Sequence, residues 1–228
     1  MMKNMMKTAC AIAVLAASAN VMAESVDLTI KGTIARIACK PNISGGGVID
    51  YGVISPDSLK TDDFTNLSRK TSNITITCDA PAKLGLYIIN NRQGTTPGYP
   101  AKRIFDYPTP GAKLFDTASI AVLGLGMAND KPIGAWAARF VNVTADNTAA
   151  DVIRSNNNGD YAKFAGFTPG ESRAIYSTLA KTGELLPVAA KVFSYDIEVE
   201  AYINKASELD VSKPAALDGS ATIELVYI

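Results

Sequence analysis

The stretch 192–203, "VFSYDIEVEAYI", alternates apolar and polar side chains along most of its length. Every second residue from Phe193 to Ala201 is apolar, whereas the residues between them, from Ser194 to Glu200, are polar or charged. Successive side chains of a β-strand point to opposite faces, so a period of two predicts a strand with one face on a core and one in water. This is the clearest strand in the sequence, and it favours an antiparallel sheet.

A second alternating region lies upstream, at 73–89, "NITITCDAPAKLGLYII". Ile74, Ile76 and Cys78 share one face, and the alternation resumes after a turn-like segment that contains Pro81. Proline cannot donate a ladder hydrogen bond in the middle of a sheet. The region is therefore predicted to be a pair of strands, or one strand broken at the proline.

Further short β-rich runs are separated by turn residues, and no long amphipathic helix is evident. Residues 119–128 and 133–143 are further candidate strands, 147–172 is expected to be a long surface excursion, and 172–180 could form at most one or two helical turns. Many short strands with regular turn signals are typical of an all-β sandwich or barrel. We therefore expect an all-β domain.

The chain ends in "SATIELVYI", residues 220–228, another alternating stretch. Ala221, Ile223, Leu225 and Tyr227 fall on one face of the predicted strand. Chain ends are usually loose unless something holds them. This strand is therefore expected to have a partner, which is either a neighbouring strand of its own fold or another protein.

The first 23 residues have the pattern of a secretory signal peptide. Lys3 and Lys7 precede a short apolar run, and small residues end the segment at Ala23. The run is shorter than the roughly 20 residues needed to cross a bilayer, so no membrane anchor is expected. We therefore expect an exported mature chain of residues 24–228, organised as a single domain.

Two cysteines, Cys39 and Cys78, remain after the signal peptide, which contains Cys10. Exported chains enter an oxidising compartment, where a disulfide is the default state of two cysteines. A reactive pair is the poorer interpretation, because no Cys-x-x-Cys spacing is present. We expect a Cys39–Cys78 disulfide.

The composition argues against catalysis and against nucleic-acid binding. The chain has no histidine, so it lacks the commonest general base and the commonest zinc ligand, and its formal net charge is +0. The acidic pair Asp62–Asp63 is better explained as a solvated turn, and the glycine-rich stretch 44–52 lacks the Gly-Lys-Ser ending of a phosphate loop. That stretch is expected to be a turn feeding a strand at 49–53. No catalytic, cofactor-binding or metal site is predicted.

The pattern of an exported chain with "IKGTIARIAC" (30–39), "NITITC" (73–78) and a terminal alternating strand resembles the pilin subunits of chaperone-usher fimbriae. More closely, the chain resembles the GltF-like family of pilin-related periplasmic proteins of Gram-negative bacteria. The stretches that carry this closer resemblance are "SGGGVIDYG" (44–52), "LSRKTSNITITCDAP" (67–81), "NNRQGT" (90–95), "AKTGELLPV" (180–188) and "LDGSATIELVYI" (217–228).

The resemblance implies an immunoglobulin-like, pilin-type β-sandwich that lacks its last strand and exposes an apolar groove, with the disulfide joining the first two strands. It also implies an insertion around 91–185. A periplasmic chaperone, and later the N-terminal segment of another fimbrial subunit, would fill the groove. The resemblance assigns chaperone or subunit binding to the strand with Ala221, Ile223, Leu225 and Tyr227, and the donor role to Val26, Leu28 and Ile30.

The function implied is that of a non-catalytic fimbrial or fimbria-associated subunit, located in the periplasm or carried to the cell surface in a fimbrium that serves adhesion. Two alternatives stay open. The first is a periplasmic binding or regulatory protein whose pilin-like sandwich completes itself, because the segment before position 30 is short. The second is a hydrolase or carbohydrate-active enzyme on a β scaffold, which the missing histidine disfavours.

Overall fold

The computed structural model describes residues 27–32, 37–156 and 159–228. The chain divides into two compact units, 1–35 and 36–228. In the smaller unit, residues 27–32 have no regular secondary structure. The predicted signal peptide, 1–23, lies outside the described residues. Within the described ranges, no helix is long and apolar enough to span a membrane.

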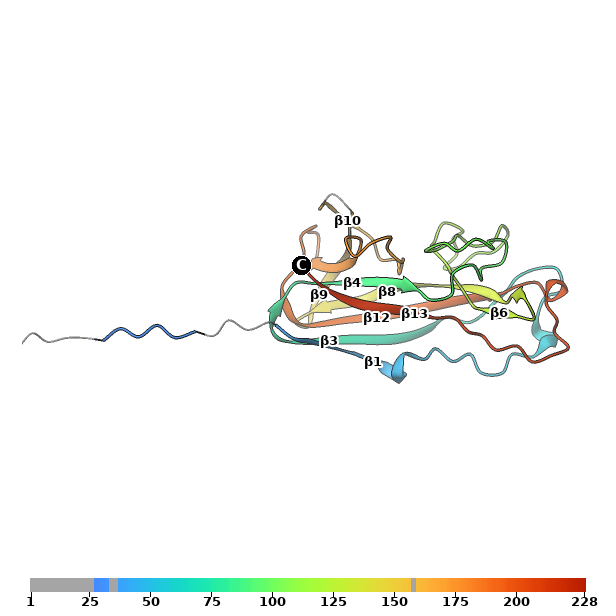
Figure 1. Ribbon diagram of the computed structural model, residues 1–228, viewed down its shortest axis with the longest axis horizontal. Helices are drawn as coiled ribbons and strands as arrows, with labels where there is room; N and C mark the ends of the chain where they lie inside the picture. Colours follow the sequence, from blue (N-terminus) through green and yellow to red (C-terminus); the bar gives the residue numbers. More distant parts are fainter. Residues whose placement is uncertain (1–26, 33–36, 157–158) are drawn as a thin grey trace, which may run out of the picture. The chain divides into compact units, whose positions relative to one another are not determined.

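The larger unit is built around one antiparallel sheet of eleven strands (Figure 1). We call its two halves the first limb and the second limb. In spatial order, the first limb consists of β1 (Cys39–Ile43), β3 (Lys70–Ala82), β12 (Ala190–Ile203) and β8 (Gly134–Ala145). The short β2 (Thr65–Asn66) pairs with β12, and the short β5 (Leu123–Gly124) pairs with β8. The second limb consists of β9 (Thr148–Ser155), β11 (Ser177–Lys181), β4 (Leu84–Asn90) and β13 (Ala221–Tyr227), with β10 (Tyr161–Lys163) beside β9.

A few short elements complete the structure. A separate two-stranded hairpin joins β6 (Met127–Ala128) to β7 (Lys131–Pro132), and the 3-10 helices are η1 (Ser44–Gly47), η2 (Pro56–Ser58) and η3 (Ala206–Glu208). The described residues contain no α-helix. The all-β prediction is therefore confirmed.

The sheet curls because, among the named strands, pairing between its two limbs occurs only at the tip of the β8–β9 hairpin. The pairing there covers Thr144 with Ala149 and Ala145 with Thr148. Beyond this tip the limbs separate and enclose a common core between them. The largest cluster of buried apolar side chains draws on both limbs, with Ile76 and Phe193 from the first and Leu86 and Leu179 from the second.

Strand β12 shows how the alternating sequence produces this core. Phe193 and Tyr195 are fully buried, and Ile197 and Val199 are nearly so, as the period of two predicts. Glu200, which is expected on the solvent-facing side of the strand, is only 8% exposed. The prediction fails there because a second apolar cluster covers that end of the outer face. It consists of Phe64, Ala112, Leu114, Phe115, Val122, Ala135, Ala137 and Tyr202.

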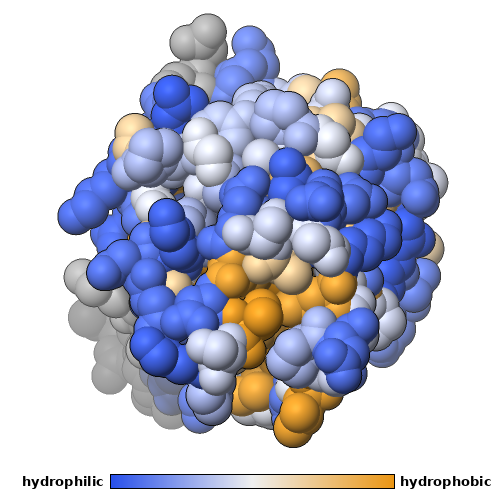
Figure 2. All heavy atoms as spheres, turned by 90° about the vertical axis from the view of Figure 1, so that its right-hand side faces the viewer, coloured by the Kyte–Doolittle hydropathy of each residue, from blue (hydrophilic) through white to orange (hydrophobic). Residues whose placement is uncertain are grey.

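Apolar residues also gather at the end of the unit where η2, η3 and the β6–β7 hairpin lie. A third buried cluster there consists of Leu125, Ile133, Ala201 and Ile203. Figure 2 views the molecule from this end and shows an apolar patch that reaches the surface and is bordered by polar residues.

Two other sequence predictions need correction. The residues 147–172, expected to be a surface excursion, contain β9 and β10. The helical turns considered for 172–180 are instead a turn at 172–176 followed by the first residues of β11. The region 73–89 does form two strands, but β3 and β4 do not pair with each other, because they belong to different limbs. Periodicity identifies the faces of a strand and not its neighbours.

The range expected to hold an insertion, 91–185, contributes to the sheet as well as to loops. Five sheet strands, β5, β8, β9, β10 and β11, lie in it, whereas 91–122 contains no strand that pairs with the sheet. The loop 91–122 supplies most of the apolar side chains that cover the outer face of the first limb.

The predicted disulfide is confirmed. Cys39 and Cys78 are directly opposite each other in the β1–β3 pairing, and they are joined through their sulfur atoms over a sequence separation of 39. The bond fixes the first residue of β1 to the middle of β3. Because β1 has only five residues and contacts the sheet on one side, this bond is an important attachment of the edge strand.

Candidate functional site

The curled sheet has two free edges, and they face each other. Among the described residues, β1 pairs only with β3, and β13 pairs only with β4. One end of the gap between the two edges is bridged by a hydrogen bond, which the backbone N–H of Cys39 donates to the hydroxyl of Tyr227 over 3.0 Å. Such unpaired edges can accept a further strand.

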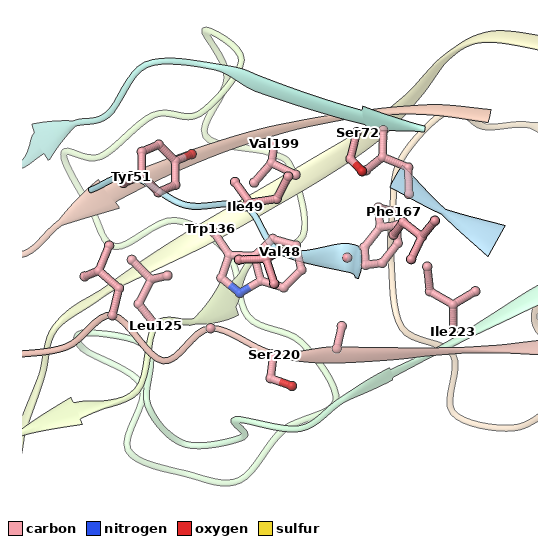
Figure 3. Close-up of a pocket in the computed structure, with 16 residues that line it drawn as sticks. Val48, Ile49, Tyr51, Ser72, Leu125, Trp136, Phe167, Val199, Ser220 and Ile223 are labelled. Atoms are coloured by element: carbon pink, nitrogen blue, oxygen red, sulfur yellow. The ribbon is translucent and has the colours of Figure 1, made fainter. Parts of the chain in front are cut away.

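An apolar groove of about 370 Å³ opens between these edges (Figure 3). Trp136 from β8 and Val199 from β12 lie on its floor together with Phe167, and Ile223 of β13 lies on its wall. We call this the β1–β13 groove. Its lining is Ile43, Gly47, Val48, Ile49, Tyr51, Ser72, Leu125, Trp136, Phe167, Ile197, Val199, Leu217, Gly219, Ser220, Ala221 and Ile223.

The groove contains no charged side chain, and the phenol of Tyr51 is its one titratable group. Burial, with a smaller contribution from the charge of Glu200, raises the pKa of Tyr51 to about 12. The Tyr51 hydroxyl and the indole Nε1 of Trp136 are buried without a hydrogen-bond partner. The largely apolar lining therefore suits apolar side chains.

The segment that follows β1 crosses the mouth of the groove. Gly45 and Gly46 have φ values of +62° and +64°, which glycine adopts without strain and which turn the chain after β1. The Ser44 side chain fixes this turn to β3, because its hydroxyl accepts the backbone N–H of Asn73 at 2.8 Å. The strand predicted at 49–53 does not form, and this segment has no β-pairing.

Two valines of this segment differ in their relation to the groove. Val48 lines it and is still 69% exposed, so its side chain lies at the mouth. Val53 is fully exposed and lies outside the lining. They provide a matched pair for mutagenesis.

The residues predicted on the terminal strand are brought together by β13. Ala221, Ile223 and Leu225 pack against the main core, and the first two line the groove. Tyr227 is 53% exposed and closes one end of the gap through its hydroxyl. On the opposite face, the Glu224 carboxylate pairs with Arg173 at 2.6 Å. The role of this strand in binding stays a prediction.

The predicted donor residues belong to the other compact unit. Leu28 and Ile30 are exposed, and Val26 lies outside the described residues. Their exposure leaves two large apolar side chains without a core of their own.

The floor of the groove could not be assigned from the sequence. The sequence pattern predicts a strand around Trp136 but assigns this side chain to no face, and Phe167 lies in the range expected to be a surface excursion. Trp136 is the single tryptophan of the chain, and a bulky aromatic residue in an otherwise alanine-rich strand is the signal that could have drawn attention to it.

The described residues contain no group of three metal-ligating side chains close enough to hold an ion.

Comparison with known proteins places the chain among relatives of similar length. Residues 28–137 match the family described as "Protein of unknown function (DUF1120)". The chain is homologous to Protein GltF of Escherichia coli (strain K12), with 29% identity covering 96% of this chain and 95% of GltF. It is also homologous to the uncharacterized protein YhcF of the same strain, with 26% identity covering 90% of this chain and 92% of YhcF. The predicted resemblance to GltF is thus confirmed, whereas the relation to pilins stays a prediction.

Proposed function

We propose that the β1–β13 groove receives a β-strand from another protein, and that the chain is a non-catalytic fimbrial or fimbria-associated subunit. The observation that carries this proposal is the pair of free edges, β1 and β13, with an uncharged apolar groove between them. An added strand would pair with the free edge backbone and place every second side chain in the groove. The fold would then be an immunoglobulin-like sandwich that lacks one strand.

Energetics support an occupied groove. Each large aliphatic side chain that an added strand buries contributes about 1.5–3 kcal/mol, and the edge amides gain hydrogen-bond partners. An unoccupied edge of this kind is an aggregation hazard. On this proposal, a periplasmic pilus chaperone would fill the groove first, and a strand from another fimbrial subunit would later replace the chaperone. The protein would then be located in the periplasm or, within a fimbrium, at the cell surface.

One observation favours a second candidate, a self-completed periplasmic binding or regulatory protein. Ile49 and Tyr51 of the segment after β1 already line the groove, and the Tyr227 hydroxyl already joins β13 to β1. If these contacts suffice, the edges need no partner. The chain would then be a stable monomer.

Isolation of the tagged mature protein from the periplasm under native conditions tests the proposal. We expect a stoichiometric partner, identified by the intact mass of the complex, that slows amide exchange in β1 and β13. The partner should also shift the fluorescence of Trp136 to shorter wavelength, because this single tryptophan lies on the groove floor. An unpartnered monomer with slow exchange at both edges would support the self-completed alternative instead.

The two valines supply the matched variants. Val48→Asp should reduce the recovered complex by about tenfold or more, because an added strand would bury an unpaired carboxylate at the mouth of the groove. Val53→Asp makes the same change on a side chain outside the groove and should behave as wild type. Equal recovery from both variants would contradict the assignment of the groove.

A synthetic peptide spanning 24–32 identifies the donor. If a second copy of this chain supplies the strand, the peptide should shift Trp136 fluorescence, and a peptide with aspartate in place of Leu28 and Ile30 should not. No shift, together with a complex in the periplasm, would exclude self-assembly through this segment and leave the chaperone as partner.

A further inference from the structure

A second pocket, of about 430 Å³, lies apart from the β1–β13 groove. One wall is the loop from Phe105 to Ala121, and the other is the segment from Phe164 to Thr168. Figure 1 shows the loops before β5 and around β10 rising on the same side of the sheet. We call this the outer-face pocket, and its volume is within the range of small-molecule sites, about 300–1,000 Å³.

The pocket is lined by two arginines and by no carboxylate. The Arg139 guanidinium is already engaged, since its Nε donates to Glu198 at 2.7 Å and its Cζ lies 4.6 Å from the ring centroid of Phe115. Arg154 differs, because within the described part of the chain no carboxylate pairs with it. Its Cζ lies 5.0 Å from the ring centroid of Phe164.

Arg154 therefore keeps a charge in a partly buried position without an anionic partner. Burial lowers the pKa of its guanidinium, which means that the charged form is disfavoured there. A carboxylate from outside would offset this cost through charge-assisted, bidentate hydrogen bonds. The position of the cation inside a pocket directs such a carboxylate to one place.

The rest of the lining suits a ring that carries hydroxyl groups. Tyr107 is 52% exposed and stands edge-on to Phe105, with 5.9 Å between the ring centroids, so it presents an aromatic surface to the pocket. Hydroxyl side chains from Thr117, Ser119 and Thr168 also line it. Aromatic faces pack against the C–H groups of a sugar ring, while hydroxyl side chains exchange hydrogen bonds with its oxygens.

We propose that the outer-face pocket binds an acidic saccharide, with the sugar carboxylate on Arg154 and the ring against Tyr107. This inference does not depend on the β1–β13 groove, and the two sites involve different residues. An aromatic carboxylic acid could also pair with Arg154, but its ring would offer no hydroxyl group to the three hydroxyl side chains, so the saccharide is the better match.

Titration calorimetry with the mature protein tests this site. The probes are a galacturonic acid disaccharide, its neutral methyl ester, and benzoate. We expect saturable binding of the acidic disaccharide, with the neutral ester and benzoate each about tenfold weaker or worse, because the ester loses the charged contact and benzoate loses the hydroxyl contacts.

Two variants assign the contact. Arg154→Gln should weaken the acidic disaccharide by about tenfold or more, and Tyr107→Ser, a half-exposed position, should weaken it without a change in melting temperature. Arg103→Gln removes the same charge from an exposed residue outside the lining and should leave binding unchanged. Three results would each overturn the proposal. The first is that the ester or benzoate binds as tightly as the acidic disaccharide, and the second is that neither Arg154→Gln nor Tyr107→Ser weakens the binding of the acidic disaccharide. The third is that none of the probes binds.

Discussion

Asp106 carries a buried carboxyl group whose charged form is disfavoured by its surroundings. It is 2% exposed, and its Oδ1 has no hydrogen-bond partner. Burial raises the pKa of its carboxyl group, although a hydrogen bond from Thr96 and the charge of Arg103 act in the opposite direction. A carboxylate whose pKa is higher in the folded state than in the unfolded state destabilises the fold wherever it is ionised.

We therefore expect Asp106→Asn to increase the free energy of unfolding at pH 7. The gain should shrink as the pH falls through the raised pKa, because the wild-type carboxyl group becomes protonated in the folded state and its penalty disappears. Urea unfolding of both proteins from pH 7 to about pH 4 measures this. Asp62→Asn, at an exposed acid, is the control, and a gain that grows toward low pH would contradict the assignment.

The β8–β9 hairpin connects the first limb to the second, and its turn consists of two residues. Asp146 and Asn147 have φ values of +48° and +61°. Both central residues of a type I′ turn require positive φ, and aspartate and asparagine tolerate it better than most residues. This Asp-Asn pair between two β-rich runs is a hairpin signal, and reading it would have located β9.

The Asp146 side chain also binds the backbone of β12 at a break in its regular pairing with β3. Its Oδ1 accepts the backbone N–H groups of Lys191 at 2.9 Å and Val192 at 2.8 Å, where the pairing of β12 with β3 shifts register. We expect Asp146→Ala to lower the free energy of unfolding by about 1–3 kcal/mol, because it removes a charged acceptor shared by two amides. Urea denaturation measures the loss.

Asp146→Asn is the matched variant, because it retains an acceptor oxygen and tolerates positive φ. Its loss should be clearly smaller than that of Asp146→Ala. If the two variants are equally destabilised, the negative charge rather than the hydrogen-bond geometry holds the register shift.

At the level of elements, the sequence predicts faces better than partners. The alternation around Tyr195 correctly predicts the inward face of β12 from Phe193 to Val199, and that around Ile223 predicts the inward face of β13 from Ala221 to Leu225. Alternation cannot reveal that β3 and β4 lie in different limbs. Nor can it show that a loop covers Glu200, or that Phe167 reaches the groove, because those contacts join residues far apart in the chain.

The larger unit is a sheet whose first and last strands, β1 and β13, do not pair with each other. Because both edges belong to short strands near the ends of the described unit, closing the gap with an added strand disturbs no pairing inside the sheet. The loop 91–122 covers the outer face of the first limb and forms one wall of the outer-face pocket. The β1–β13 groove and the outer-face pocket thus have no lining residue in common, so the two proposals can be tested separately.

The disulfide attaches β1, one edge of the gap between β1 and β13, to β3. It joins Cys39 to Cys78 over a sequence separation of 39, for which the chain-entropy estimate is about 4 kcal/mol. Replacing both cysteines by alanine should lower the free energy of unfolding by about 2–5 kcal/mol. The effect should extend beyond stability, since β3 is the strand with which β1 pairs and Ile43 of β1 lines the groove.

We therefore expect the double variant to exchange the amides of Lys40 and Asn42 faster than the wild type while the amides of β12 stay protected at low denaturant. Trp136 emission should move to longer wavelength as water reaches the groove floor. Reduction of the wild-type protein should reproduce both changes, which separates loss of the bond from loss of the side chains. If stability falls while β1 exchange and Trp136 emission stay as in the wild type, the rest of the sheet positions β1, and the disulfide does not maintain the groove.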